Sequence, residues 1–464
     1  MLIFLLLAIE VALLVLSYLI LKRDIFQPFT VMMAVFVVST TIACFNFKSW
    51  HIYFAPKTIV IMSLGFLCAL AANILVVRIP DIVREPICRP VPKIEVSYVA
   101  IAVVVCLELL TLYFYYQDIV RIAAIDGYTP GSNLLWHYRN ATSYHVIASL
   151  NPLIAILTKI VAAIGYVFTF IIICNVLDRH TPVSKICTLC VPVALFAIQV
   201  LLGSGRQELL RLGSFAIVVI YILINSRNGW RNQYSKKFIA GILACIPIAF
   251  LGFYLATNLI GRKTSRSFFV YISTYAGGSI QHFNEYIMDP SQAKPTSHFG
   301  EETFPGVYSL LYKLHLTDFH RPVHLELRPL GITKGNIYTF FRRPYHDFGL
   351  FGMCLMAFLV LLVFSWLYAS IKVKGVNNHT NVAIIRYAYL FYWIILASID
   401  QYSIGIFSAG TVLTLILFSC VYYMVVQFPA KPDLEWRYFF EEFTSFTHRV
   451  QTQLKSPGES TQET

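Results

Sequence analysis

The chain has 464 residues, of which 57% are hydrophobic and only 13% are charged, and its mean hydropathy is +0.66. Soluble domains carry about 25% charged residues, so this composition excludes a soluble enzyme and predicts an integral membrane protein. The net charge of +12 would suit a nucleic-acid-binding protein. In a membrane chain, however, the side on which Lys and Arg lie matters more than their total, and no nucleic-acid partner is expected.

Eleven apolar runs are long enough to cross a bilayer as helices, since about 20 apolar residues span the hydrocarbon layer of about 30 Å. The first run has no small-residue cleavage site before Lys22, so we expect it to be retained as a helix. The sequence therefore predicts an all-α polytopic membrane protein of about eleven transmembrane helices. In chain order, the expected spans are 2–21, 28–45, 58–77, 97–116, 150–176, 186–202, 208–225, 238–258, 347–370, 384–400 and 405–427.

The charge of the connectors indicates an orientation. If the connector with Lys22 and Arg23 is cytoplasmic, the short cytoplasmic connectors and the tail hold nineteen Lys and Arg, against six in the short outer connectors. Basic connectors stay on the cytoplasmic side. We therefore expect the N-terminus outside and the C-terminus in the cytoplasm.

This topology divides the chain into four parts. Helices one to eight occupy 1–258, a large extracytoplasmic loop occupies 259–346, helices nine to eleven occupy 347–427, and a cytoplasmic tail with an interfacial amphipathic helix occupies 428–464. The loop is aromatic-rich where it approaches Gly277-Gly278. That pattern predicts a folded loop with a helix pair or re-entrant element over the membrane domain.

Polar groups concentrate in the outer loop, above all where it runs into span nine. There the sequence places Arg342, Arg343, His346 and Asp347 together at the outer membrane surface. Two guanidinium forks beside a histidine and a carboxylate suit a reaction on a lipid diphosphate. The structural alternative is an interfacial belt of arginines and aromatic residues with Asp347 as the N-cap of span nine.

A second candidate anion site is the outer turn that holds Arg206. Gly203 and Gly205 permit a tight turn whose amides can approach an anion, whereas an arginine snorkelling at a helix end is the alternative. The chain has no Asp-x-Asp pair, so we expect no metal and no other cofactor. Cys187 and Cys190 are interpreted as packing residues, because no second ligand pair accompanies them.

Three segments of the chain also resemble a known family. They are Gly203-Ser-Gly-Arg206, Tyr271 to Asn284, and above all Gly335-Asn-Ile-Tyr-Thr-Phe-Phe-Arg342 followed by Asp347-Phe-Gly-x-x-Gly352. These segments resemble the oligosaccharide repeat-unit polymerases of the O-antigen and capsule polymerase family (Wzy type). The resemblance implies a GT-C-like membrane glycosyltransferase that polymerises repeat units on the outer face of the bacterial cytoplasmic membrane. It implies undecaprenyl-diphosphate-linked glycans as donor and acceptor, with a flippase and a chain-length regulator as further partners.

For this reaction we expect Asp347 and His346 to be catalytic, as acceptors of the proton of the attacking sugar hydroxyl. The expected ligands of the diphosphate and the glycan are Arg206, Arg342, Arg343, Arg328, Arg321, Asn336, Tyr338 and His282.

Two alternative functions stay open. A ligase would transfer the finished glycan to another acceptor by the same chemistry, and a transporter or flippase would also have many spans. Transporters usually place charged groups near the bilayer midplane. Here the buried candidates are few, chiefly Glu10, Glu108 and Lys159, which favours an enzyme.

Overall fold

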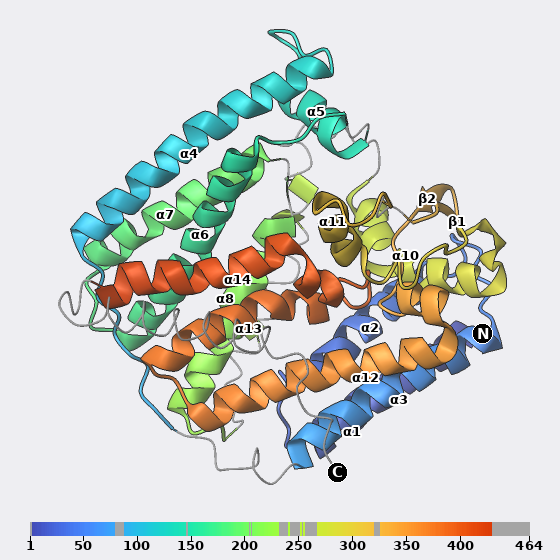
Figure 1. Cartoon of the computed structure of the whole chain (residues 1–464). Coiled ribbons are helices and arrows are strands. Elements are labelled where there is room, and N and C mark those ends of the chain that lie inside the picture. The colour runs from blue at the N-terminus through green and yellow to red at the C-terminus, as the bar shows by residue number, and fades with distance from the viewer. Residues whose placement is uncertain are drawn as a thin grey trace, which may run out of the picture.

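The computed structural model is a bundle of long helices (Figure 1). It describes residues 2–78, 88–144, 147–203, 205, 207–231, 240–241, 251–252, 254–255, 267–319 and 325–428. Within this part of the chain, nine helices are long and apolar enough to cross a membrane. They are α1 (Leu2–Ile20), α2 (Pro28–Phe45), α3 (Pro56–Arg78), α4 (Tyr98–Ile125), α6 (Pro152–Asp178), α7 (Val183–Leu202), α8 (Gln207–Arg227), α12 (Arg342–Lys374) and α14 (Ala409–Tyr422), which η4 (Tyr423–Gln427) extends.

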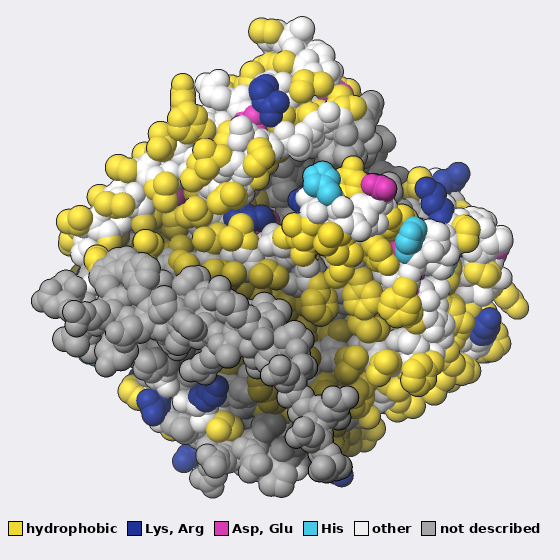
Figure 2. Space-filling view, viewed as in Figure 1, with side chains coloured by type: hydrophobic (Ala, Val, Ile, Leu, Met, Phe, Trp, Pro, Cys, Tyr) yellow, Lys and Arg dark blue, Asp and Glu magenta, His cyan; other side chains and the backbone are white. Residues whose placement is uncertain are grey.

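The sides of the bundle are apolar. Figure 2 shows hydrophobic side chains over most of the described surface in view, and large side chains such as Val99, Val103 and Phe351 are exposed. Such a surface is unfavourable in water and favourable in lipid, where each helix satisfies its own backbone hydrogen bonds. The chain is therefore an all-α, multi-pass membrane protein, as the sequence predicts.

Two of the eleven expected spans are not among these nine helices. The span expected at 238–258 lies almost entirely outside the described residues. The span expected at 384–400 corresponds to α13 (Asn378–Ile395), which is less apolar because it carries Arg386 and several tyrosines. Most of its side chains are buried by α2, α6, α8, α12 and α14, so protein rather than lipid covers it. Eleven spans and a GT-C-like fold stay predictions, and the amphipathic tail helix also lies outside the described residues.

The smaller elements gather at one end of the bundle, near the N-terminus (Figure 1); we call this the loop end. They are α5 (Leu134–Arg139), η1 (Asn140–Tyr144), α10 (Phe268–Met288), η2 (Pro290–Gln292), α11 (Pro305–Lys313), β1 (Arg328–Leu330), β2 (Thr333–Gly335) and η3 (Ser403–Phe407). The part of the predicted outer loop that the structure describes is therefore folded.

Of the two forms expected around Gly277-Gly278, the re-entrant element stays a prediction and the helix pair is wrong, because α10 is one continuous helix across both glycines. Their role is close packing. A Cβ at Gly277 would lie 2.8 Å from the Ile42 side chain of α2, and one at Gly278 would lie 2.8 Å from the Leu330 side chain. The missing side chains let α10 lie directly against α2 and the β1–β2 hairpin.

The entry into α12 is bent at a glycine. Residues 342–348 form a short helical segment, and Gly349, with φ 66° and ψ −163°, interrupts the helix before its long apolar part. A positive φ of this kind favours glycine, and a Cβ at this position would meet no neighbouring atom. Backbone conformation rather than space therefore requires Gly349, which lets the polar segment leave the axis of the spanning helix.

At the opposite end of the bundle, a buried carboxylate ties α12 to its neighbours. The Asp24 carboxylate accepts hydrogen bonds from the Tyr221 hydroxyl at 2.5 Å and the Tyr368 hydroxyl at 2.9 Å. It also forms an ion pair with Lys372. The far end of α12 is thus fixed to α8 and to the connector between α1 and α2.

We predict that this end faces the cytoplasm and the loop end faces outside, because Lys and Arg are concentrated in the connectors of this end. A reporter fused near Lys374 should be active only inside the cell, and one fused near Thr296 only outside. Activity of paired cytoplasmic and extracytoplasmic reporters at both positions is the measurement. The reverse pattern at both sites would contradict the orientation.

Candidate active site

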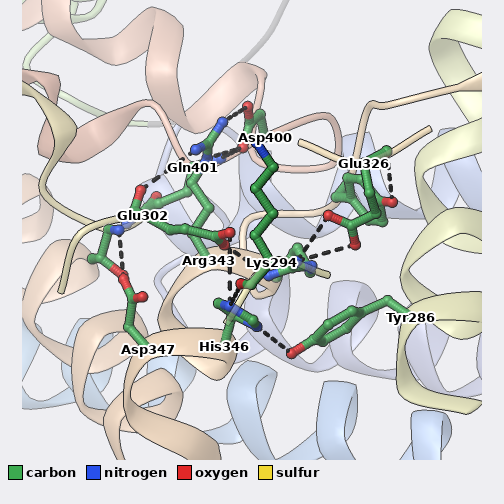
Figure 3. A network of polar contacts seen from close by, with 12 residues as sticks. Tyr286, Lys294, Glu302, Glu326, Arg343, His346, Asp347, Asp400 and Gln401 are labelled. Carbon is green, nitrogen blue, oxygen red and sulfur yellow. Dashed lines mark hydrogen bonds and ion pairs between the residues drawn. The ribbon is translucent and has the colours of Figure 1, made fainter. Parts of the chain in front are cut away.

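The short first segment of α12 brings Arg342, Arg343, His346 and Asp347 together, as the sequence predicts. They meet side chains from α10, from the turn before α11, from the segment before β1 and from the segment after α13 (Figure 3). The partners from these four segments are Tyr286, Glu302, Glu326 and Asp400.

Arg342 is fully buried, and carboxylates bind its guanidinium on two sides. Nη1 donates to Glu302 Oε2 at 2.9 Å, and Nη2 donates to both carboxylate oxygens of Glu326 at 3.0 Å. The Tyr286 ring centroid lies 3.7 Å from the guanidinium carbon. A guanidinium removed from water needs such partners, so Arg342 joins α10 and two loop segments to α12.

Arg343 is bound in a bidentate pair. Its Nε and Nη2 donate to the two oxygens of Asp400 at 2.9 and 3.0 Å, and its Nη1 donates to the Glu302 backbone carbonyl at 3.4 Å. Parallel bonds of this type fix geometry as well as charge. Diphosphate binding by Arg342 and Arg343 stays a prediction, but in this structure both guanidiniums are engaged by carboxylates of the chain itself.

The His346 imidazole is held at both nitrogens. Nε2 lies 2.9 Å from the Lys294 backbone carbonyl and Nδ1 lies 3.0 Å from the Tyr286 hydroxyl. Glu302 Oε1 is 3.7 Å from Nε2. Because the carbonyl can only accept, the proton of a neutral imidazole is assigned to Nε2, and Nδ1 then accepts from the tyrosine hydroxyl.

Among the described residues, only one of the two Asp347 carboxylate oxygens has a hydrogen-bond donor. Its Oδ2 accepts the Thr303 backbone N–H at 2.6 Å, whereas its Oδ1 is buried and receives no hydrogen bond from any described residue. The N-cap role considered for Asp347 is not seen, because Asp347 lies inside the first helical segment of α12 and the hydrogen bond it accepts comes from Thr303 rather than from an N–H of the spanning helix. Asp347 therefore presents a fixed carboxylate with an open acceptor position.

The network contains more carboxylates than arginines among the described residues: Glu302, Glu326, Asp347 and Asp400 against Arg328, Arg342 and Arg343. Burial raises the pKa of Glu302 to about 7, although Arg342 and Arg343 act against it. Burial also acts to raise the pKa of Glu326, but the contacts with Arg342 hold it below its usual value. The network thus has one carboxyl that titrates near neutral pH.

The remaining predicted ligands have structural contacts where they are described. Arg328 donates to the backbone carbonyls of Glu285 and Asp289 at 3.1 and 2.7 Å, and so caps the end of α10. The Tyr338 hydroxyl donates to the Glu326 backbone carbonyl at 3.0 Å. His282 Nδ1 lies 2.8 Å from the Ile337 carbonyl, and burial lowers its pKa to about 4, which keeps it neutral.

Of the three further predicted ligands, only Asn336 is among the described residues. Asn336 is half-buried just after β2. Arg206 and Arg321 lie outside the described residues, so their predicted roles are untested. Within the described part of the chain, no group of three or more His, Cys, Asp or Glu side chains could hold a metal ion.

The carboxylate partners are what sequence reasoning missed. Glu302 stood out only as one of many polar loop residues, and Glu326 and Asp400 were not singled out. One signal was available for Asp400: it is the only carboxylate between Asp347 and Asp433. A single acid in so long an apolar stretch needs a cationic partner when it is buried.

We predict that Arg342→Ala destabilises the protein strongly, because Glu326 would keep a charge and Glu302 a buried carboxyl without their common partner. Loss of one member of a buried ion pair costs about 3–5 kcal/mol. Thermal unfolding of the purified protein in detergent is the measurement. The exposed pair of Lys93 and Glu95 provides the control, since Lys93→Ala should leave the transition unchanged. Equal effects of the two substitutions would contradict a structural role for Arg342.

The raised pKa of Glu302 predicts that the stability of the protein depends on pH. Its pKa is about 7 in the native state against a usual value of 4.5, so between these values the native state binds more protons than the unfolded chain. The free energy of unfolding should therefore fall as pH rises through this window. Glu302→Gln should flatten the dependence of the melting temperature on pH between 4.5 and 7. An unchanged slope in the variant would show that another group carries the effect.

Comparisons with known proteins give this site no assignment. No family model, no curated protein and no solved structure matches the chain. The contacts within the site are therefore the basis on which a function can be inferred.

Proposed function

We propose that this protein is a membrane glycosyltransferase that polymerises undecaprenyl-diphosphate-linked oligosaccharide repeat units on the outer face of the bacterial cytoplasmic membrane. The proposal combines the multi-pass helical bundle with the acid network at its loop end and with the resemblance of the 335–352 segment to repeat-unit polymerases. A surface polysaccharide would be the product.

The observation that carries the proposal is the open oxygen of Asp347. A buried acceptor without a donor costs free energy in the unliganded protein, so such a group at a functional site indicates a donor that a ligand supplies. A sugar hydroxyl is a donor of this kind. The Thr303 N–H holds the second oxygen at 2.6 Å, which directs Oδ1 toward a fixed position.

In this mechanism Asp347 is the general base. Its Oδ1 takes the proton of the acceptor hydroxyl while the hydroxyl oxygen forms a bond to the anomeric carbon of the donor sugar. The bond between that carbon and the diphosphate oxygen breaks, and the lipid diphosphate leaves with the electron pair. Arg342 and Arg343 hold Glu302, Glu326 and Asp400 around the base. His346, whose two nitrogens are both occupied, is the second candidate base.

A glycan ligase would use the same groups and would differ only in its acceptor. A transporter has one observation in its favour, the buried carboxylates of Glu10 in α1 and Glu108 in α4. These helices lie on opposite sides of the bundle (Figure 1). Two acids so placed do not form one path through the protein, so this alternative is the weaker.

We predict that Asp347→Asn abolishes polymerisation while the protein still folds. The asparagine oxygen can accept the Thr303 N–H, but the amide cannot take a proton, and a general base contributes about 10²–10⁴-fold to the rate. Membranes that contain the variant should accumulate single lipid-linked repeat units, which gel analysis of lipid-linked glycans would detect.

Asp289→Asn is the matched control, because Asp289 lies in the same loop and its carboxylate accepts hydrogen bonds from Ser291 and Gln292. Its polymer should keep the normal length. Long polymer from Asp347→Asn at normal protein level would remove Asp347 as the base. If His346→Gln alone abolished polymerisation in that case, the role would pass to His346.

A further inference from the structure

A second polar cluster lies at the loop end, between α6, α8 and α13. Arg211 Nη1 donates to Glu208 Oε1 at 2.6 Å and to the Tyr389 hydroxyl at 2.9 Å. The Tyr166 hydroxyl donates to the other Glu208 oxygen at 3.0 Å. We call this group, together with Lys159 and Tyr392, the Lys159 cluster.

Arg211 is fixed and still has donors to spare. The rings of Tyr389 and Tyr392 lie 4.8 and 5.1 Å from its guanidinium carbon. Its Nε is buried and finds no hydrogen-bond acceptor among the described residues, and the buried hydroxyl of Tyr392 likewise has no described partner. A preformed guanidinium with unused N–H groups is suited to a planar or tetrahedral oxyanion.

Lys159 adds a second cation without a matching acid. Its ammonium makes no hydrogen bond or ion pair with any described residue, and the charged groups that act on it are Glu208, Arg211 and Lys313. Gly410 leaves room for it, since a Cβ there would lie 3.1 Å from Lys159 Nζ. Among the described residues, one carboxylate thus faces three cations, of which Lys159 and Arg211 are partly buried and Lys313 is exposed.

The cluster is open to the surface at the loop end. Lys159 is half-buried, and 38% of the Glu208 side chain is exposed. Figure 2 shows Lys or Arg side chains set into a hollow of the otherwise apolar surface, in the region where α6, α8 and α11 meet in Figure 1. A ligand could therefore reach the cluster with an anionic group while an apolar chain stays against the surrounding helices.

The cluster also adjoins the acid network. Tyr402, which follows α13, contacts the Gln207 side chain and lies within electrostatic reach of Asp400, Arg343 and Arg211. An anion bound at Lys159 and Arg211 would therefore lie beside the segment that holds Arg343 through Asp400.

We propose that the Lys159 cluster binds the phosphate or diphosphate head group of a polyprenyl lipid. This inference deepens the proposed function, on which its choice of lipid class rests. Lys159 and Arg211 supply the charge, the Tyr392 hydroxyl supplies a further donor, and Glu208 holds Arg211 in place. In the transfer reaction, the cluster would stabilise the diphosphate as it leaves the donor sugar.

Binding to the full-length protein in lipid nanodiscs tests the inference without requiring catalysis. The probes are geranylgeranyl diphosphate, inorganic diphosphate and geranylgeraniol, and the variants are Lys159→Gln, Arg211→Gln and Lys57→Gln. Lys57 is the matched control, because it is an exposed lysine at the start of α3, away from the cluster. Lys159 makes no hydrogen bond or ion pair with a described residue that its replacement would break, so Lys159→Gln should keep the melting temperature.

We expect the wild type to bind geranylgeranyl diphosphate, and Lys159→Gln to weaken this binding at least about tenfold, the worth of a charge-assisted hydrogen bond. Arg211→Gln should also weaken it, and Lys57→Gln should not. Binding of the lipid diphosphate but not of geranylgeraniol supports a site for the head group. Binding of inorganic diphosphate alone, or equal binding by Lys159→Gln and the wild type, would overturn the inference.

These results are independent of the proposed reaction. If the protein binds the lipid diphosphate through Lys159 but makes no polymer, the site stands and the polymerase function fails. If the protein makes polymer while Lys159→Gln binds normally, the function stands and the Lys159 cluster is not the diphosphate site.

Discussion

The buried guanidinium of Arg342 is the constraint on which the candidate active site depends. A fully buried cation must find acceptors within the protein, and here they come from Glu302 and Glu326, which lie 40 and 16 residues earlier in the chain. Two loop segments are therefore drawn onto the start of α12, and the Tyr286 ring adds α10. The loop end is folded because a charge at the end of a membrane helix has to be neutralised there.

The two polar clusters differ in their charged groups among the described residues. Several carboxylates lie around Asp347, whereas one carboxylate lies with three cations around Lys159. A glycosyl transfer needs both environments, because a proton must be accepted on one side of the reacting carbon and a diphosphate must be released on the other. If a carboxylate base and a diphosphate shared one cluster, their like charges would destabilise each other. Separate neighbouring clusters avoid that repulsion.

The sequence predicted most spanning helices because lipid requires long uninterrupted apolar runs. It was less informative for α13, where surrounding helices replace lipid. The grouping of Arg342, Arg343, His346 and Asp347 followed from their spacing within one turn-and-helix segment. Their partners did not follow, since the contact of Asp400 with Arg343 is a tertiary one that no local spacing encodes. The glycine pair in α10 was misjudged for the same reason, because a helix end and a close helix contact both favour glycine.

The position of Asp347 follows from what holds α12 at each end. The Asp24 carboxylate fixes the far end of the helix, and Gly349 separates the long spanning part from the short polar segment. The angle of that segment is therefore set by the loop contacts of Arg342 and Arg343 rather than by the membrane helix. Because Asp400 holds Arg343 and precedes Tyr402, which lies within electrostatic reach of Arg211, one short segment after α13 links the candidate base to the cationic cluster. That segment, and neither cluster alone, would then determine the distance between the proton acceptor and the leaving group.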